Sequence, residues 1–214
     1  MAQCLKIHPT HPQARLVRLA ADIVRAGGVI AYPTDATYAL GCRIGDAPAA
    51  TRIRELRQVD ERHHLSLVCR DLAEVGRYAR MDNAQFRVVK QGAGGRFTFL
   101  LRATADVPRR AQHPKRSTIG IRIPRHAVVL ALLAALDEPM LSSTLLLPGE
   151  AEPLHDPETV MSRIGRRIDA LVDAGLSGTT PSTVIDLEAT PPIVVRRGLG
   201  DPAELGIEDA GELG

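Results

Sequence analysis

Residues 28–41 read Gly28-Val-Ile-Ala-Tyr-Pro-Thr-Asp-Ala-Thr-Tyr-Ala-Leu-Gly41 and combine a predicted strand with a polar turn. The apolar run from Val29 to Tyr32, bounded by Gly28 and Pro33, is typical of a short buried strand. The turn that follows carries four side chains able to form hydrogen bonds, namely Thr34, Asp35, Thr37 and Tyr38.

Two interpretations fit this polar turn. Open α/β sheets bind ligands just beyond the carboxyl ends of their strands, which makes the turn one wall of a predicted ligand site. Alternatively, Thr and Asp are common at helix N-caps, and the turn then only opens the next helix. The stretch by itself favours neither interpretation, so other motifs in the chain have to decide.

Strands and helices alternate along the chain. Periodicity and capping residues predict helices over residues 13–26, 47–57, 82–90, 127–136 and 156–167. The expected N-caps are Asp46, either Asp82 or Asn83, and Asp156. The helix over 127–136 is apolar almost all round and is expected to be buried. Strands are predicted over residues 4–7, 29–32, 65–69, 97–101, 118–123, 168–172, 182–186 and 193–197, and one begins at 140. We find no repeat or dividing linker, so the prediction is a single α/β domain with helices on the faces of its sheet.

Composition places the chain among ordinary globular proteins. Its 214 residues are 44% hydrophobic and 24% charged. No apolar run approaches the roughly 20 residues that span a bilayer, and the first residues lack the pattern of a signal peptide. A cytoplasmic protein without membrane association is therefore expected. Cys4, Cys42 and Cys69 are too scattered for a disulfide framework or a zinc knuckle.

Positive charge is concentrated in one segment. Residues 107–136 contain no acidic side chain but six cations, namely Arg109, Arg110, Lys115, Arg116, Arg122 and Arg125. Such a segment attracts phosphates, and because only 3% of residues are aromatic, base stacking is poorly supplied. Shape and phosphate recognition of structured RNA is the favoured function. The alternative is a solvated face balanced by acids elsewhere, such as Glu150 or Asp156.

Several catalytic signatures are absent from the sequence. It contains no G-x-x-x-x-G-K-[ST], no G-x-S-x-G and no H-E-x-x-H motif, and the loop at 92–95 lacks Rossmann spacing. The adjacent His63 and His64 would point apart on a strand or loop, which favours surface or site-lining histidines over metal ligands. No metal site is predicted.

A second group of small hydroxyl side chains lies in the C-terminal half. Ser182 and Thr183 begin a short β segment that ends at Asp186, and Arg196 and Arg197 lie at the end of the last predicted strand. Together with Ser142, Ser143 and Thr144, these residues offer hydroxyl groups and cations for one anionic ligand, provided that the strand ends converge.

Residues Pro33-Thr-Asp-Ala-Thr-Tyr-Ala-Leu-Gly41 resemble the P-T-D-T-x-Y-G-L signature of the YrdC-like domain family. Later motifs of that family are matched in order by residues 97–101, 120–124, 182–186 and 195–198. Residues 67–71, 107–110, 138–142 and 147–149 are similar to the YciO branch of the family. The resemblance covers residues 10–200 and leaves residues 201–214 as a flexible acidic C-terminal tail.

This resemblance implies a fold and a chemistry. YrdC-like proteins have a twisted, mixed, open α/β sheet with a concave basic cavity. The best-known members, the threonylcarbamoyl-AMP synthases, convert L-threonine, bicarbonate and ATP with Mg²⁺ into threonylcarbamoyl-adenylate for tRNA threonylcarbamoyladenosine modification. Several members bind double-stranded RNA or tRNA. The implied partners are therefore tRNA or double-stranded RNA together with ATP, L-threonine and bicarbonate. The chain is expected to be a monomer or homodimer without a permanently bound cofactor.

The matched motifs also imply roles for single residues. Substrate binding is expected from Thr34, Asp35, Tyr38 and Arg122. Nucleotide binding is expected from Arg57, Ser142, Thr144, Ser182 and Arg196. The expected RNA contacts are Arg109, Arg110, Lys115, Arg116 and Arg125, and the candidate catalytic residues are Arg57, His63 and His64.

Two motifs depart from the pattern of the synthases. Their K-x-R motif is matched by Arg57 and Val59, and their S-x-N motif by Thr144 and Leu146. Val59 removes a cation and Leu146 removes an amide, and each lost contact to a phosphoryl group costs roughly 3–4 kcal/mol. Weak synthesis is therefore expected. The alternative is hydrolysis of the threonylcarbamoyl group on tRNA or its adenylate, with a histidine as base.

Overall fold

One mixed sheet carries the described part of the chain, which comprises residues 1–60, 63 and 65–208 of the computed structural model. Its strands are β1 (Gln3–Lys6), β2 (Ile30–Pro33), β3 (Tyr38–Arg43), β4 (Ser66–Val68), β5 (Ala79–Arg80), β6 (Phe97–Ala103), β7 (Thr118–Arg122), β8 (Met140–Thr144), β9 (Ala170–Asp173), β10 (Thr183–Asp186) and β11 (Ile193–Arg196). The α-helices are α1 (Ala14–Arg25), α2 (Ala47–Arg57), α3 (Leu72–Tyr78), α4 (Asn83–Gln91), α5 (Ala127–Leu136) and α6 (Pro157–Ile164).

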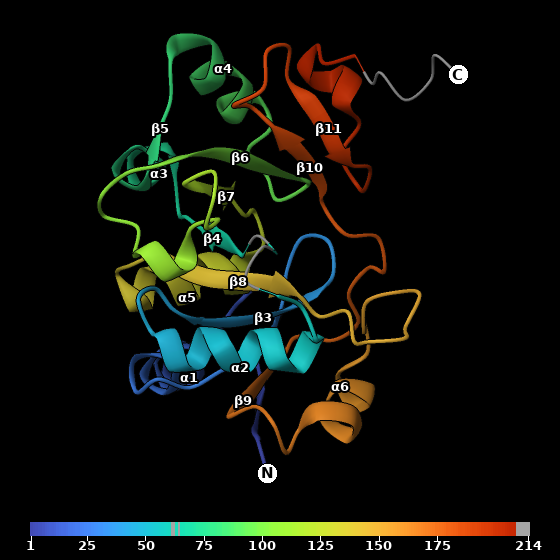
Figure 1. Ribbon diagram of the computed structural model, residues 1–214. Coiled ribbons are helices and arrows are strands. Elements are labelled where there is room, and N and C mark those ends of the chain that lie inside the picture. The colour runs from blue at the N-terminus through green and yellow to red at the C-terminus, as the bar shows by residue number, and fades with distance from the viewer. Residues whose placement is uncertain (61–62, 64, 209–214) are drawn as a thin grey trace.

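The strand order is β1-β9-β2-β3-β8-β4-β7-β6-β10-β11, with β5 paired to β6 at the side. Strand β9 pairs in parallel with β1 and β2, β4 with β7, and β6 with β10, whereas β3 and β8 are antiparallel to both of their neighbours. The edges β1 and β11 lie at opposite ends of the molecule (Figure 1). The mixed, open α/β sheet predicted from the sequence is confirmed.

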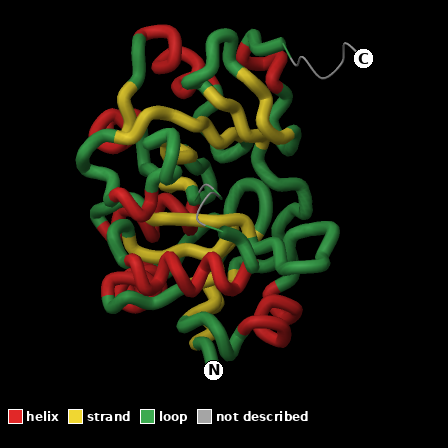
Figure 2. Tube along the Cα trace, in the orientation of Figure 1, coloured by secondary structure: helices red, strands yellow, loops and turns green. Residues whose placement is uncertain are grey.

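Different helices cover the two faces of the sheet. Successive side chains of a strand point to opposite faces, so neighbouring residues of one strand belong to different clusters. Leu40, Leu67 and Leu141 belong to a core cluster that includes buried residues of α2, α3, α4 and α6. The opposite face carries Val68 and Met140, which pack in a second cluster with α1 and α5. Figure 2 shows helices at both sides of the central strands.

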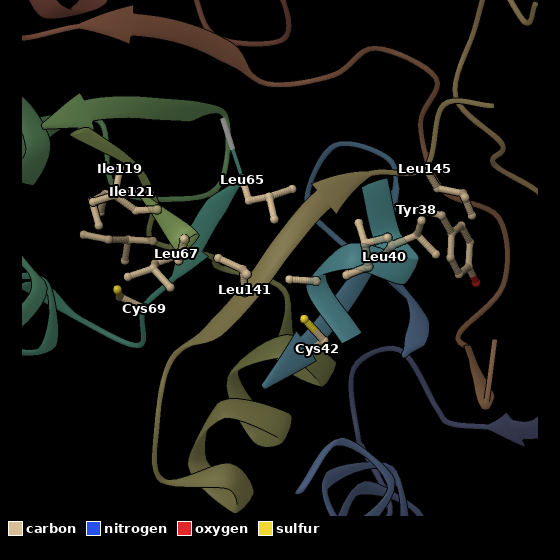
Figure 3. Close-up of a cluster of buried hydrophobic side chains, with 14 of the residues drawn as sticks. Tyr38, Leu40, Cys42, Leu65, Leu67, Cys69, Ile119, Ile121, Leu141 and Leu145 are labelled. Carbon is tan, nitrogen blue, oxygen red and sulfur yellow. The ribbon is translucent and has the colours of Figure 1, made fainter. Parts of the chain in front are cut away.

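The first of these clusters crosses the centre of the sheet (Figure 3). Leu40, Leu67 and Leu141 come from β3, β4 and β8, which are adjacent in the strand order, and each side chain is at most 1% exposed. Burying one such side chain contributes about 1.5–3 kcal/mol to folding. Apolar side chains from these neighbouring strands therefore pack across the centre of the sheet and help to hold it together.

Three helices begin at the aspartates that the sequence predicts as N-caps. Asp46 accepts a hydrogen bond from the Ala49 amide at 2.9 Å, and Asp156 accepts one from the Thr159 amide at 3.0 Å. Asp82 forms a full capping box with Gln85. Each cap satisfies amides that the first helical turn leaves without a carbonyl partner.

The stretch at residues 28–41 folds as a β-hairpin, which neither interpretation of its polar turn anticipated. The Thr34 amide donates to the Thr37 carbonyl at 3.0 Å and closes the turn between β2 and β3. Strand β3 escapes pattern reading because all but one of its residues are buried, so apolar and polar side chains do not alternate. Helix α2 begins only at Ala47, after this hairpin.

Other elements also differ from the prediction. Helix α3 was not predicted, although Asp71 caps it by accepting from the Glu74 amide at 2.8 Å. Helix α5 was expected to be buried on all sides, but Ala134 is exposed and only one face packs on α1. Within the predicted tail 201–214, Leu205 and Ile207 are buried in the core.

The residues from 209 onward lie outside the described part of the chain. Within that part, none of the helices combines the length and the apolar character that crossing a bilayer requires.

Candidate functional site

A cavity of about 400 Å³ opens on the sheet face that also carries α1 and α5, over the strands from β8 to β11. Ser66 and Ser142 belong to this face, since they lie two residues from Val68 and Met140 on the same strands. The residues that line the cavity are Arg57, His63, Ser66, Thr98, Leu100, Arg122, Ser142, Ser143, Thr144, Ser182, Val184, Val195 and Arg196.

Three arginines converge on this cavity from three elements. Arg57 ends α2, Arg122 ends β7 and Arg196 ends β11, and none of the described lining residues is acidic. Burial and the nearby charge of Arg196 lower the pKa of Arg57 to about 10, so it is cationic at neutral pH. Burial, together with the charge of Arg122, also lowers the pKa of Arg196. In two of these cations, Arg57 and Arg196, a neighbouring arginine adds to the lowering of the pKa, and such a group of cations favours an anionic ligand.

Arg122 is the most enclosed of the three arginines, with 7% of its surface exposed. Its Nε and Nη2 atoms donate to the Gly95 carbonyl at 3.0 and 2.7 Å, and Nη2 also donates to the Thr34 hydroxyl at 3.2 Å. Burial lowers the pKa of Arg122, while Tyr32 and Asp35 partly oppose that shift. Neutral oxygens therefore fix the direction of this guanidinium without neutralising its charge.

Arg57 connects three lining segments of the cavity. Its Nη1 atom donates to the Ser143 hydroxyl at 2.6 Å and lies 2.7 Å from His63 Nε2, while Nε donates to the Leu146 carbonyl at 3.3 Å. A guanidinium group can only donate, so His63 Nε2 accepts this hydrogen bond and the imidazole is neutral. The proton of His63 then lies on Nδ1.

Hydroxyl groups form the floor between these cations. The Tyr32 hydroxyl lies 2.6 Å from that of Ser142, and the Thr98 hydroxyl lies 2.8 Å from that of Ser182. Gly120 provides depth, because a Cβ atom there would lie 2.7 Å from Ser66 Oγ. Rotatable hydroxyls next to cations suit an oxygen-rich anion, since they both donate and accept.

The cavity brings together seven of the residues to which the sequence assigned binding or catalytic roles. They are Arg57, His63, Arg122, Ser142, Thr144, Ser182 and Arg196. The strand ends thus converge as the predicted anion site required. His64, the other candidate catalytic histidine, lies outside the described residues.

The predicted substrate residues of the hairpin do not line this cavity. Thr34 is buried, and its hydroxyl donates to the Thr37 carbonyl at 2.7 Å while accepting from Arg122. Asp35 accepts from the Arg125 amide at 3.1 Å. The Tyr38 hydroxyl donates to the Gly175 carbonyl at 2.8 Å, and its ring lies in the core on the other sheet face (Figure 3). Of these three side chains in the described structure, only that of Thr34 forms a hydrogen bond with a residue that lines the cavity, which is Arg122.

The predicted RNA-binding cations differ in their surroundings. Arg116 pairs with Asp186, which is 4% exposed, while Lys115 and Arg125 lie before and after β7. Among the described residues, no carboxylate lies within ion-pair distance of the charged side-chain groups of Arg109, Arg110, Lys115 or Arg125.

The acids expected to balance this segment have other partners. Glu150 pairs with Arg163 at 2.6 Å, and Asp156 caps α6. Among the described residues, neither of these two acids forms an ion pair with a cation of residues 107–136, and the acid that does so is Asp186, with Arg116.

Sequence reasoning missed two hydroxyl residues of the cavity. Ser66 and Thr98 lie inside the apolar runs of β4 and β6, and the pattern of these runs predicts only strands. A hydroxyl within a buried strand is itself a signal, because it needs a hydrogen-bond partner there. No group of three or more His, Cys, Asp or Glu able to hold a metal lies within the described residues.

Most of this sequence is similar to known proteins. Residues 22–198 match the family model Sua5_yciO_yrdC, described as telomere recombination. The protein YciO of Escherichia coli K12 is 48% identical over 201 residues, covering 94% of this chain and 98% of YciO. The threonylcarbamoyl-AMP synthase of Halorhodospira halophila is 34% identical over 170 residues, covering 79% of this chain and 88% of the synthase.

Solved structures show the same fold. The crystal structure of E. coli YciO superimposes with a TM-score of 0.93 at 47% identity, covering 96% of this chain and all of YciO. P. abyssi Sua5, solved with L-threonine, gives a TM-score of 0.84 at 24% identity. That comparison covers 91% of this chain and 57% of Sua5.

We predict that the cavity binds inorganic pyrophosphate and that Arg196→Ala weakens this binding about 10-fold or more, because a charge-assisted hydrogen bond is lost. Isothermal titration calorimetry measures the affinity. Arg197→Ala is the matched control, since it removes the same charge from the next residue, which does not line the cavity. Equal losses in the two variants would mean that the surface charge, and not the cavity, binds the anion.

Proposed function

The chain belongs to the Sua5/YciO/YrdC family and is related to threonylcarbamoyl-AMP synthase, and from this we propose that it is an RNA- and nucleotide-binding protein of tRNA threonylcarbamoyl modification. In this proposal the arginine-lined cavity holds the phosphates of ATP or of threonylcarbamoyl-adenylate. Synthesis of the adenylate from L-threonine, bicarbonate and ATP is slow.

The observation that carries this proposal is the convergence of Arg57, Arg122 and Arg196 on one cavity without an acidic residue among its described lining. A polyphosphate compensates several cations at once, which a neutral ligand does not. The volume of about 400 Å³ falls within the range of small-molecule sites. Hydroxyls of Ser142 and Ser182 supply further hydrogen bonds to phosphate oxygens.

Slow synthesis follows from the groups that surround Arg57. Leu146 supplies only its backbone carbonyl, which accepts from Arg57 at 3.3 Å, and its side chain offers no polar atom. Arg57 is further held by Ser143 and His63. A cation that is tied to three protein groups is less available to the charge that develops on a transferring phosphoryl group.

We expect Mg²⁺ in the cavity only as a complex with ATP. Its preferred protein ligands are carboxylates, and the described lining residues of the cavity include none. The donor set of hydroxyls and arginines therefore does not fit a resident magnesium site, and the phosphates would have to hold the ion.

RNA binding is proposed for the exposed cations near the N-terminal end of α2. Arg109 and Arg110 are exposed, lie beside Asp46 and Ala47, and pair with no described carboxylate. Unpaired cations on a surface release counterions when they contact phosphates, which makes the binding dependent on salt. Structured RNA is the partner that this chemistry fits.

A second candidate function, hydrolysis of the threonylcarbamoyl group, is favoured by the contact between Arg57 and His63. An anion that engages Arg57 would release the lone pair of His63 Nε2, which could then take a proton from water. The water oxygen bonds to the urea carbon, and the bond from that carbon to adenine N6 breaks. The proton passes to N6, and threonine leaves as its carbamate.

We expect the wild-type protein to release little pyrophosphate from ATP when L-threonine and bicarbonate are present. A Val59→Arg, Leu146→Asn double variant should raise this release about 100-fold, because it restores two polar contacts. A coupled pyrophosphate assay measures the rate, and omitting L-threonine is the control for plain ATP hydrolysis. Release as fast in the wild type as in the variant would contradict the assigned role of these positions.

For RNA, we expect an Arg109→Ala, Arg110→Ala double variant to bind tRNA more weakly and with a smaller dependence on salt, by about 0.7–0.9 in log–log slope per lost contact. Fluorescence anisotropy over a salt series measures both quantities. Arg15→Ala, Arg18→Ala on α1 is the matched control, because both residues are exposed cations. An unchanged slope would remove Arg109 and Arg110 from the interface.

If the chain is a hydrolase, His63→Ala should slow loss of threonylcarbamoyl from modified tRNA about 100-fold, since general base catalysis contributes that much. Mass spectrometry of the digested tRNA measures the modified nucleoside. His155→Ala removes an exposed histidine and should leave the rate unchanged. Modified tRNA that survives long incubation with the wild type would refute hydrolysis.

A further inference from the structure

One arginine of the cavity, Arg122, is oriented by a residue that does not itself line the cavity. Arg122 donates through Nε and Nη2 to a single carbonyl, that of Gly95, at 3.0 and 2.7 Å. No ion pair joins Arg122 to a carboxylate among the described residues. Since only neutral oxygens hold Arg122, a small shift of the Gly95 carbonyl would turn the guanidinium relative to the cavity.

Asp35 lies directly against Gly95. A Cβ atom added to Gly95 would lie 2.0 Å from Asp35 Oδ2, so the carboxylate packs on the Gly95 backbone where any other residue would have a side chain. Gly95 also has φ +82°, in the left-handed region that favours glycine. Two separate constraints therefore keep this residue a glycine, and one of them is Asp35.

The same carboxylate is fixed to the chain that carries Arg122. Both oxygens of Asp35 accept from the Arg125 amide at 3.1 Å, three residues beyond Arg122. The Gly94 amide donates to the Ile123 carbonyl at 3.0 Å, which joins the glycine loop to the end of β7 a second time. Asp35 thus bridges the hairpin turn, the loop at Gly95 and the exit of β7.

From this geometry we propose that Asp35 is a positioning residue, which acts through the Gly95 carbonyl to hold the Arg122 guanidinium toward the ligand of the cavity. Asp35 does not line the cavity. The inference rests on the proposed anion-binding function of the cavity and deepens it. The carboxylate of the polar turn, assigned to substrate binding by family resemblance, instead orients a residue that binds.

The charge of Asp35 also raises the pKa of Arg122, against the effect of burial. A test therefore has to separate the effect of Asp35 on the position of Arg122 from its electrostatic effect. Asp35→Asn keeps an oxygen that accepts from the Arg125 amide but removes the charge. Asp35→Ala removes both the oxygen and the packing against Gly95. If position is what matters, the asparagine variant retains function and the alanine variant loses it.

The first test is the affinity for inorganic pyrophosphate, measured by isothermal titration calorimetry. We expect Asp35→Ala to weaken binding about 10-fold and Asp35→Asn to change it less than about 3-fold. In an Arg122→Met background, Asp35→Ala should have no further effect, because residues that act as one unit are not additive. An equal loss in the asparagine variant, or a further loss in the Met background, would overturn the proposal.

The second test does not depend on a ligand. The Nε–H proton of Arg122 points at the Gly95 carbonyl and should give a slowly exchanging NMR signal, assigned by its absence in Arg122→Lys. We expect this signal to persist in Asp35→Asn and to move or disappear in Asp35→Ala. An unmoved signal in a folded Asp35→Ala variant would refute the positioning role. Failure of the wild type to bind pyrophosphate would instead refute the proposed function.

Discussion

The site is organised by a buried cation that has no carboxylate partner among the described residues. Arg122 sits at the end of β7, almost fully enclosed, and is bound by the Gly95 carbonyl and the Thr34 hydroxyl. Taking a charge out of water without a counterion costs several kcal/mol. Apolar packing elsewhere offsets this cost, including the cluster across β3, β8 and β4 on the opposite face of the sheet. A charge kept in this way remains available to a ligand.

The hairpin at residues 28–41 supports this arrangement from one side. Its turn places Thr34 against Arg122 and Asp35 against Gly95, while Tyr38 points into the core of the opposite face. The residues of the family signature in this stretch therefore have two different structural roles. Part of it orients the cavity and part of it packs the sheet, which explains why so many polar residues follow one short strand without lining the cavity themselves.

Sequence reasoning succeeded where a residue reveals its role locally. Aspartate caps at Asp46, Asp82 and Asp156 and the polar ends of β8 and β10 could be read from single motifs. It failed where the role depends on the partner strand. Strand β3 is buried on both faces and shows no alternation, and Ser66 and Thr98 become cavity residues only because β4 and β6 lie near β8 and β10. Such proximity is a property of strand order, which no local pattern encodes.

Strand order also explains why the cavity can differ in chemistry from its relatives without a change of fold. The arginines come from the ends of α2, β7 and β11, whereas Leu146 and Val59 lie in the connecting segments after β8 and α2. Residues in such segments can change without disturbing the apolar core beneath the sheet. A sheet that fixes the cations and leaves the surrounding loops free to vary can retain an anion site while the reaction at that site diverges.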